Sequence, residues 1–437
     1  MREMKDSRVE WIGQIPAHWN LVRLKSLIVT RDGGAWGEEA AGRDGDMICL
    51  RIADFDYQRY CFKSHGELTV RHFKPDVIER LRLMPGDILV EKSGGGEKTP
   101  VGRAVLFDKD YSALYSNFMD RLRCKDGINP QWLLYNWATL YANNYTRPYI
   151  KQTTGIQNLD ISGLLSSQFI ALPSENEQEK VLSVVLNESK KVDALIANVQ
   201  AQIEKLKDYK QSVITEVVTK GLDPAMPMKN SGFEWIGEIP AHWGVTRIKN
   251  MFELWNERND EADLTKVNLI SLYTDLGVVQ HSDLTATTGN RAVTAEGYKI
   301  VRKHDIVVNI ILCWMGAVGM SQYDGVTSPA YDIYRPLKDT NSEYYHYLFR
   351  TNRFNGECYR YGRGIMMMRW RTYSTEFRAI NIPCPPAEEQ KKIVTHLNEK
   401  CNKIDQLIAI KQAKIEKLEQ YKRSLIYEYV TGKKEVR

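Results

Sequence analysis

EWIGQIPAHW at residues 10–19 recurs as EWIGEIPAHW at residues 234–243, with one difference in ten positions. A repeat this long and this close is the mark of an internal duplication, and it sets the frame for the rest of the chain. Arg23, four residues after the first copy, matches Arg247 after the second. The chain therefore consists of two related halves.

A second repeat closes each half. Residues 177–219 align without gaps on residues 389–431, and both segments share the letters IEKL and a final VT. Apolar residues recur in each at alternating spacings of three and four, with no proline or glycine, which predicts a long helix with a narrow apolar stripe. At ~1.5 Å per residue each helix would approach about 60 Å. Such a stripe needs a partner helix, and we expect the partner to be the other copy.

The two halves diverge between these repeats, over residues 26–170 and 250–382. Both interiors contain short β-type runs, such as GDILVEK at 86–92 and HDIVVNIIL at 304–312, followed by an aromatic, helix-like segment. This pattern predicts a mixed α/β globule in each half. If the halves are related by a pseudo-two-fold axis, the long helices run antiparallel as a coiled coil, with one globule at each end of a dumbbell.

The predicted domain limits follow from the repeats. GLDPAMPMKNSG at residues 221–232 is rich in glycine and proline, and we interpret it as a linker. The predicted order is a first globule over 1–174, a first spacer helix over 175–220, a linker over 221–233, a second globule over 234–386 and a second spacer helix over 387–431.

Composition limits the function only weakly. Lys and Arg total 60 against 55 for Asp and Glu, so any nucleic-acid-binding surface must be local. The seven cysteines are scattered and form no C-x-x-C pair, which argues against a disulfide framework or a zinc cluster and predicts a reducing cytoplasm. We expect no membrane targeting, because the N-terminal residues contain no apolar signal core and the longest apolar run, from Ile306 to Met320, is too short to span a bilayer.

The motifs and their order resemble the specificity subunits of Type I restriction-modification systems. The resemblance rests on EWIG.IPAHW, on helix starts of the form (I/L)P..EQ..I, and on the alternation of variable region and helix over essentially the whole chain. It implies two target recognition domains that each read one half of a bipartite, asymmetric DNA site, with the helices setting the spacing. The partners it implies are double-stranded DNA, two methyltransferase subunits and restriction subunits. We expect no cofactor on this chain, because the sequence contains no motif for an ATP or methyl-donor site.

Two segments of the first interior are candidate DNA contacts. In the loop over 93–99, glycines allow the backbone to approach phosphate closely and Lys98 supplies charge, although a long hairpin loop without this role is the alternative. In KQTTGIQN at 151–158, Gln and Asn side chains can pair with adenine in the major groove. The candidates of this half are Ser93, Gly94, Gly95, Lys98, Lys151, Gln152, Thr153, Gln157 and Asn158.

The matching segment of the second half, YRYGRGIMMMRWRTYS at 359–374, is the strongest basic and aromatic cluster in the chain. Arginine is the usual reader of guanine, and a solvated basic face is the alternative. We assign the methionines at 366–368 to core. The candidates of this half are Arg360, Tyr361, Arg363, Arg369, Trp370 and Arg371.

The repeated EWIG motif has two interpretations. Trp11, Trp19 and their copies Trp235 and Trp243 either dock a partner or pack as a strap over each globule, and we favour packing because aromatic burial is the commoner use. His18 and its copy have no metal-spaced partner nearby, so we expect them to be structural.

We find no catalytic constellation in the sequence. GGGEKT at 94–99 lacks the glycine spacing of a phosphate-binding P-loop, and no methyltransferase tetrad is present. Asp87, Glu91 and Lys92 are badly spaced for a nuclease, so we expect a non-catalytic protein. The rival hypothesis is a scaffold whose helices hold two protein-binding globules. Arginines clustered with aromatics, rather than exposed apolar patches, argue against it.

Overall fold

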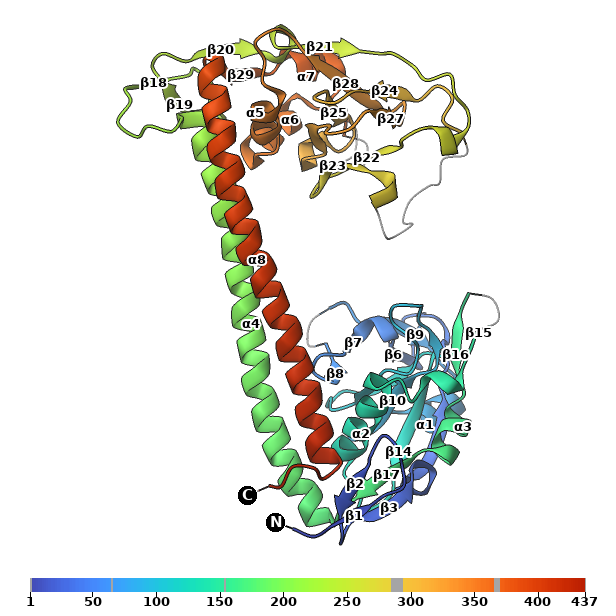
Figure 1. Ribbon diagram of the computed structural model, residues 1–437. Helices are drawn as coiled ribbons and strands as arrows, with labels where there is room; N and C mark the ends of the chain where they lie inside the picture. The colour runs from blue at the N-terminus through green and yellow to red at the C-terminus, as the bar shows by residue number, and fades with distance from the viewer. Residues whose placement is uncertain (1, 64–65, 153–154, 284–293, 365–369, 437) are drawn as a thin grey trace. The chain divides into compact units, whose positions relative to one another are not determined.

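The computed structural model describes residues 2–63, 66–152, 155–283, 294–364 and 370–436. The chain divides into two compact units, a first unit of residues 1–199 and 413–437 and a second unit of residues 200–412. Each unit contains one mixed α/β globule and a segment of each of two long helices (Figure 1). The predicted fold class is confirmed. The five consecutive domains remain a prediction.

The two long helices are α4 (Glu175–Lys220) and α8 (Ala387–Val430). Glutamates occupy the first turn of both, where negative charge stabilises the positive end of the helix dipole. In the second unit Lys210 of α4 pairs with Asp405 of α8, and Gln202 pairs with Lys411. Residue numbers rise along one helix as they fall along the other, so the paired segments are antiparallel.

The predicted apolar stripe of α4 is buried over most of its length. Leu206 and Val213 are half-buried, whereas its other apolar residues are each at most 5% exposed, namely Leu182, Val185, Val192, Ile196, Val199 and Ile203. In the first unit the start of α4 and the end of α8, including Leu425 and Ile426, join the core of the globule. Burial of the apolar residues at these helix ends, at roughly 25 cal/mol per Å² of apolar surface, holds them to the first globule. No helix among the described residues is long and apolar enough to cross a membrane.

The core of the first globule is an antiparallel sheet of four strands in the order β12–β10–β14–β4. These strands are β12 (Ala104–Leu106), β10 (Ile88–Glu91), β14 (Met119–Cys124) and β4 (Ile28–Gly33). The aromatic segment predicted to be helical is α2 (Pro130–Ala142), which Asn129 caps by accepting from the Gln131 amide. A second sheet, β13–β6–β9–β5, comprises β13 (Ala113–Tyr115), β6 (Asp46–Leu50), β9 (Val70–His72) and β5 (Glu38–Glu39).

Shorter elements complete the first globule. The strand pairs are β1 (Met4–Asp6) with β2 (Gln14–Pro16), β3 (Asn20–Arg23) with β17 (Phe169–Leu172), and β7 (Phe55–Asp56) with β8 (Cys61–Phe62). The short helices are α1 (Pro75–Leu81) and α3 (Ile161–Ser167).

The core sheet of the second globule has the order β21–β28–β25–β26. Its strands are β21 (Phe252–Trp255), β28 (Tyr331–Pro336), β25 (Ile306–Asn309) and β26 (Val318–Met320). The helices are α5 (Ser342–Phe349), α6 (Asn352–Tyr361) and α7 (Ser374–Ala379). The strand pairs are β18 (Met228–Asn230) with β19 (Glu238–Pro240), β20 (Gly244–Arg247) with β29 (Asn381–Cys384), β22 (Ile270–Tyr273) with β23 (Gly277–Gln280), and β24 (Lys299–Val301) with β27 (Gly325–Thr327).

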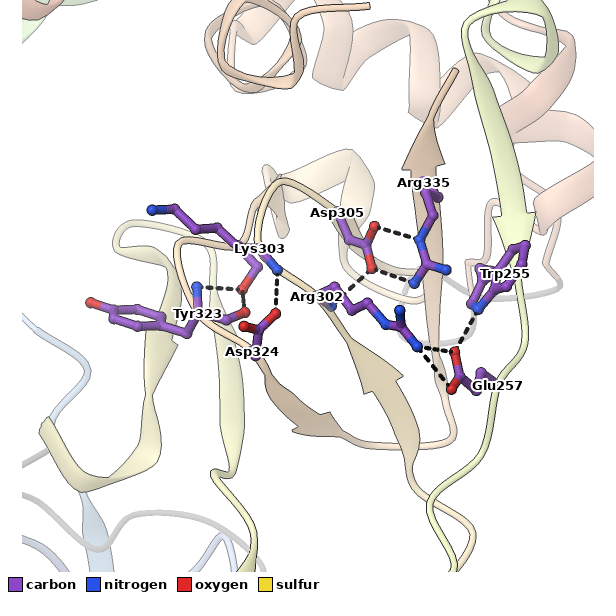
Figure 2. Close-up of polar contacts among 9 residues, drawn as sticks. Trp255, Glu257, Arg302, Lys303, Asp305, Tyr323, Asp324 and Arg335 are labelled. Carbon is purple, nitrogen blue, oxygen red and sulfur yellow. Dashed lines mark hydrogen bonds and ion pairs between the residues drawn. The ribbon is translucent and has the colours of Figure 1, made fainter. Parts of the chain in front are cut away.

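The two core sheets share one strand order and one buried ion pair, although their sequences diverge. Asp87 precedes β10 and accepts two hydrogen bonds of 2.7 Å from Arg123 of β14. Asp305 precedes β25 and accepts two of 3.2 Å from Arg335 of β28 (Figure 2). Each aspartate is 1% exposed. The duplication therefore extends through residues 26–170 and 250–382, where the two halves share no recognisable sequence repeat.

The repeated EWIG motif packs against the start of each long helix. In the first unit Glu177 accepts from His18 at 2.8 Å and from the Trp19 indole at 3.4 Å. In the second unit Glu389 makes the same contacts with His242 at 2.5 Å and Trp243 at 2.7 Å. Trp19 is 1% exposed. These contacts support packing as the role of the motif and a structural role for both histidines.

Candidate nucleic-acid interface

Both candidate segments of the first half meet in one small sheet. β11 (Ser93–Gly94) pairs with β16 (Gln157–Leu159), and β16 pairs with β15 (Ile150–Gln152). The glycine loop and the 151–158 segment are thus neighbours, although more than fifty residues separate them in the sequence. We refer to residues 150–152 and 155–159 as the first hairpin.

The polar side chains of the first hairpin divide by exposure. Lys151, Gln152 and Asn158 are exposed. Asn158 Oδ1 lies 2.6 Å from Ser93 Oγ, which ties the hairpin to the glycine loop. The structure places Gln157 inward at 8% exposure, with its Oε1 accepting from the Val101 amide at 3.1 Å. In this conformation the exposed side chains are the ones that can reach a ligand.

The charge of the first hairpin is partly balanced at its base. Lys151 Nζ lies 3.7 Å from an oxygen of Asp160. Asp160 caps α3 by accepting from the Gly163 amide, and this hydrogen bond holds the pKa of Asp160 below its usual range. Lys151 remains largely exposed, so its ammonium group can exchange this carboxylate for a phosphate.

The glycine loop follows β11. Gly95 has φ +63°, and a Cβ there would lie 2.6 Å from the Val101 amide nitrogen, so only glycine fits. Gly94 also has a positive φ, of 121°. Lys98, further along the loop, is exposed.

The candidates of the second half also come together. Arg363 and Arg371 form an antiparallel bridge in which each amide donates to the carbonyl of the other, at 2.8 and 2.9 Å. Trp370 stacks on Tyr359 with ring centroids 4.9 Å apart, and its indole donates to the Tyr359 carbonyl. We refer to residues 359–364 and 370–372 as the bridged segment.

Two arginines of the bridged segment, Arg360 and Arg363, are paired with acidic neighbours. Arg360, on α6, donates to Glu357 at 2.6 and 2.9 Å, a hydrogen bond that raises the pKa of its guanidinium, and it lies over the ring of Tyr361. Arg363 lies 3.1 Å from Glu376 and its side chain is 75% exposed. Thr153, Arg369 and the methionines at 366–368 lie outside the described residues.

The first hairpin and the bridged segment occupy equivalent places in the two halves. The first hairpin is followed by α3, β17 and α4, and the bridged segment by α7, β29 and α8. In both halves the strand after the short helix pairs with the strand that follows the EWIG motif, β17 with β3 and β29 with β20. One frame therefore presents two different sets of polar side chains.

Comparison with known proteins gives one family. Residues 240–420 match the model of the type I restriction modification DNA specificity domain. The chain is related to the specificity subunits of type I restriction enzymes. A putative type I restriction enzyme MjaX specificity subunit of Methanocaldococcus jannaschii is 25% identical over 97% of this chain and 95% of its own length. The MjaVIII specificity subunit of the same organism is 25% identical over 73% of this chain and 74% of its length.

A solved structure supports the same fold. A chain from a study of complex assembly and conformational transition in the type I R-M system superposes with a TM-score of 0.64 at 12% identity. The superposition covers 95% of the present chain and 98% of that one. The predicted resemblance to type I specificity subunits is confirmed.

Two exposed aromatic residues of the first globule were not identified from the sequence patterns. Trp36 and Phe118 are 40% and 42% exposed and flank a hollow of about 400 Å³ that Arg51 also lines. The Phe118 carbonyl accepts from the amides of Lys92 and Ser93, so this hollow adjoins β11 and the glycine loop. Neither residue belongs to a basic cluster or a periodic run, so only the fold reveals them.

The edge of the second core sheet carries a similar mixture of aromatic and charged groups. Trp255 donates to Glu257, which also pairs with Arg302 at 3.1 Å, and Arg335 lies 4.2 Å from the Trp255 ring centroid (Figure 2). Among the described residues no group of three or more His, Cys, Asp and Glu could hold a metal ion.

Proposed function

We propose that this chain is the DNA-reading subunit of a type I restriction-modification complex and that each globule reads one half of a bipartite, asymmetric site. The proposal keeps the predicted recognition domains over 1–174 and 234–386. The observation that carries it is the equivalent placement of the first hairpin and the bridged segment in two otherwise matching frames. The two halves share one arrangement of helices and strands but present different side chains at the equivalent place. This is what a protein that recognises two different DNA sequences requires.

The chemistry of the two segments supports different half-sites. Gln152 and Asn158 of the first hairpin carry amides, which pair with adenine in the major groove. Arg363 and Arg371 of the bridged segment carry guanidinium groups, which pair with guanine. Backbone contacts come from Lys98 and Lys151. The remaining proposed contacts are Ser93, Gly94, Gly95, Thr153, Arg360, Tyr361, Arg369 and Trp370. Gln157, which the sequence also suggested, is buried against Val101 and is not among them.

The long helices act as the spacer in this proposal. Antiparallel packing of α4 and α8 fixes how far apart the half-sites are read, because half-site spacing mirrors the geometry of the protein. The repeated EWIG motif and helix starts present the same surface twice, which suits two copies of one methyltransferase subunit. Restriction subunits join through that assembly. The chain itself supplies recognition, and its partners supply the chemistry.

Duplex binding at several salt concentrations tests the proposal against the scaffold alternative. Phosphate contacts make affinity fall steeply with salt, whereas an apolar protein interface responds little. We expect Lys151→Ala to weaken duplex binding and to reduce the slope of log K against log salt by about 0.9, the value for one lost phosphate contact. Lys180→Ala, which removes an exposed charge from α4, is the control. Salt-independent binding, or no binding, would favour the scaffold.

A further inference from the structure

A cavity of about 570 Å³ lies within the first unit, between the globule and the helix segments that pack on it. Its walls come from the β7–β8 turn, the glycine loop, the end of α2, and both long helices. Tyr57, Tyr60 and Tyr141 give it aromatic walls. A volume of this size is typical of small-molecule sites.

Five basic and two acidic side chains line the cavity, and two of the basic ones are neutralised within the protein. Arg103 donates to both carboxylate oxygens of Glu91, at 2.9 and 3.2 Å, and lies 3.7 Å from the Tyr57 ring centroid. Lys422 donates to Asp193 at 2.8 Å and is 7% exposed. Arg103 and Lys422 therefore form ion pairs within the protein and are not available to a ligand.

The other three basic residues are exposed and open to a ligand. Lys98, Arg147 and Arg423 line the cavity, and no side-chain partner is found for them among the described residues. They come from the glycine loop, the turn after α2, and α8. Glu419 is the one carboxylate of the described lining outside these two pairs, so the three cations leave the cavity with an excess of positive charge that favours an anion.

The duplicated half shows that Arg423 is not needed to build the helix pair. The repeat aligns Arg423 with Gln211 of α4. Gln211 is neutral and donates to the Arg350 carbonyl at 3.2 Å in the second unit. At the same place in the frame, the first unit has a charged group directed at a cavity instead of a hydrogen bond to the globule.

We propose that Lys98, Arg147 and Arg423 form a phosphate-binding site in this cavity. Guanidinium groups bind phosphate oxygens in pairs, and a lysine adds a point charge, so the three suit one phosphate or two adjacent phosphates. The tyrosine walls accommodate the sugar or base attached to it. The phosphate belongs either to the backbone of bound duplex or to a free nucleotide, and the first source rests on the proposed function.

The test compares the full-length wild type with a variant that carries Arg147→Ala and Arg423→Gln, the second change supplying the residue found in the other half. Arg80→Ala, which removes an exposed arginine of α1 outside the cavity, is the matched control. Thermal unfolding checks that all variants are folded. Binding of a random-sequence 30-base-pair duplex is measured against salt, and binding of ADP and of inorganic phosphate by calorimetry.

We expect the cavity variant to lower the salt slope for duplex by about 1.8, which is two lost phosphate contacts, while Arg80→Ala lowers it little. If ADP or inorganic phosphate binds the wild type and not the cavity variant, the site also exists but takes a free phosphate. If the cavity variant matches the wild type in every arm, the inference is wrong. Lys151→Ala separates the two proposals. If Lys151→Ala weakens duplex binding and the cavity variant does not, the proposed function stands and the cavity site is wrong. If the wild type binds no duplex at all, the proposed function fails and the ADP and phosphate arms alone decide the inference.

Discussion

Lys422 Nζ lies 2.8 Å from Asp193 Oδ1, across the two long helices of the first unit. The repeat gives the second unit the corresponding pair, Lys210 and Asp405, at 2.7 Å. The two pairs differ in burial. The side chains of Lys422 and Asp193 are 8% and 25% exposed, whereas those of Lys210 and Asp405 are 30% and 53% exposed. One duplicated ion pair therefore occurs in two dielectric environments.

We expect Asp193→Ala to be much more destabilising than Asp405→Ala. Removal of Asp193 leaves the Lys422 ammonium buried without a carboxylate, which costs about 3 kcal/mol, whereas an exposed pair contributes ~0.2–1 kcal/mol. Urea unfolding of the two variants measures the difference. Equal losses would show that burial does not set the strength of these pairs.

Gln178 and Gln390 are predicted to be equivalent supports of the two globules. Gln178 accepts from the Asn129 amide at 2.9 Å and Gln390 from the Asn341 amide at 3.0 Å, just before α2 and α5. Each glutamine is 1% exposed. Replacement by alanine leaves a partly buried backbone amide unsatisfied and should cost about 1 kcal/mol at either site.

Thermal unfolding of Gln178→Ala and Gln390→Ala measures this cost. Glu179→Ala, at an exposed neighbouring position of α4, is the control and should leave the unfolding temperature close to that of the wild type. If the unfolding temperature falls in only one of the two glutamine variants, the two glutamines are not equivalent supports.

The second unit should lose stability as the pH falls below 6.5. His346 Nδ1 accepts from the Met320 amide at 3.1 Å, and burial, with a smaller effect from Arg350, lowers the pKa of His346 from 6.5 to about 3. Between these values the unfolded chain binds a proton that the folded chain does not, so acid favours unfolding. The loss is at most about 1.4 kcal/mol for each pH unit below 6.5.

Urea unfolding at pH 7.0 and at about pH 5.5 tests this prediction. His346→Asn keeps an acceptor for the Met320 amide but cannot titrate, so the variant should lose less stability over this interval than the wild type. His396→Asn, at an exposed position of α8, should behave like the wild type. An unchanged pH response in His346→Asn would show that another group controls it.

The repeats and long helices could be predicted from the sequence because their signals are local. Identity between EWIGQIPAHW and EWIGEIPAHW needs no structure, and the apolar stripe of α4 and α8 is periodic. The shared core sheet could not be predicted, because its pairs join distant residues such as Val90 with Asp120 and Val308 with Asp332. A short apolar run shows that a strand exists but not which strand it pairs with.

The candidate interface was predictable in composition and only partly in geometry. Gln157 and Asn158 look alike in the sequence, yet the alternation of a strand turns one inward to Val101 and leaves the other exposed. Arg423 looks like an ordinary solvated helix residue, and only the packing of the globule on α8 places it on a cavity wall. Sequence patterns give residue types, while long-range packing decides which of them are accessible.

The central claim, two independent readers on one frame, is tested most directly by exchange of one interior. Residues 26–170 are replaced by those of another family member, the chain is expressed with its methyltransferase, and the methylated DNA is sequenced. We predict that methylation falls on a split, asymmetric motif and that the exchange changes only one half of it. A change in both halves, or a motif that does not depend on this chain, would contradict the account.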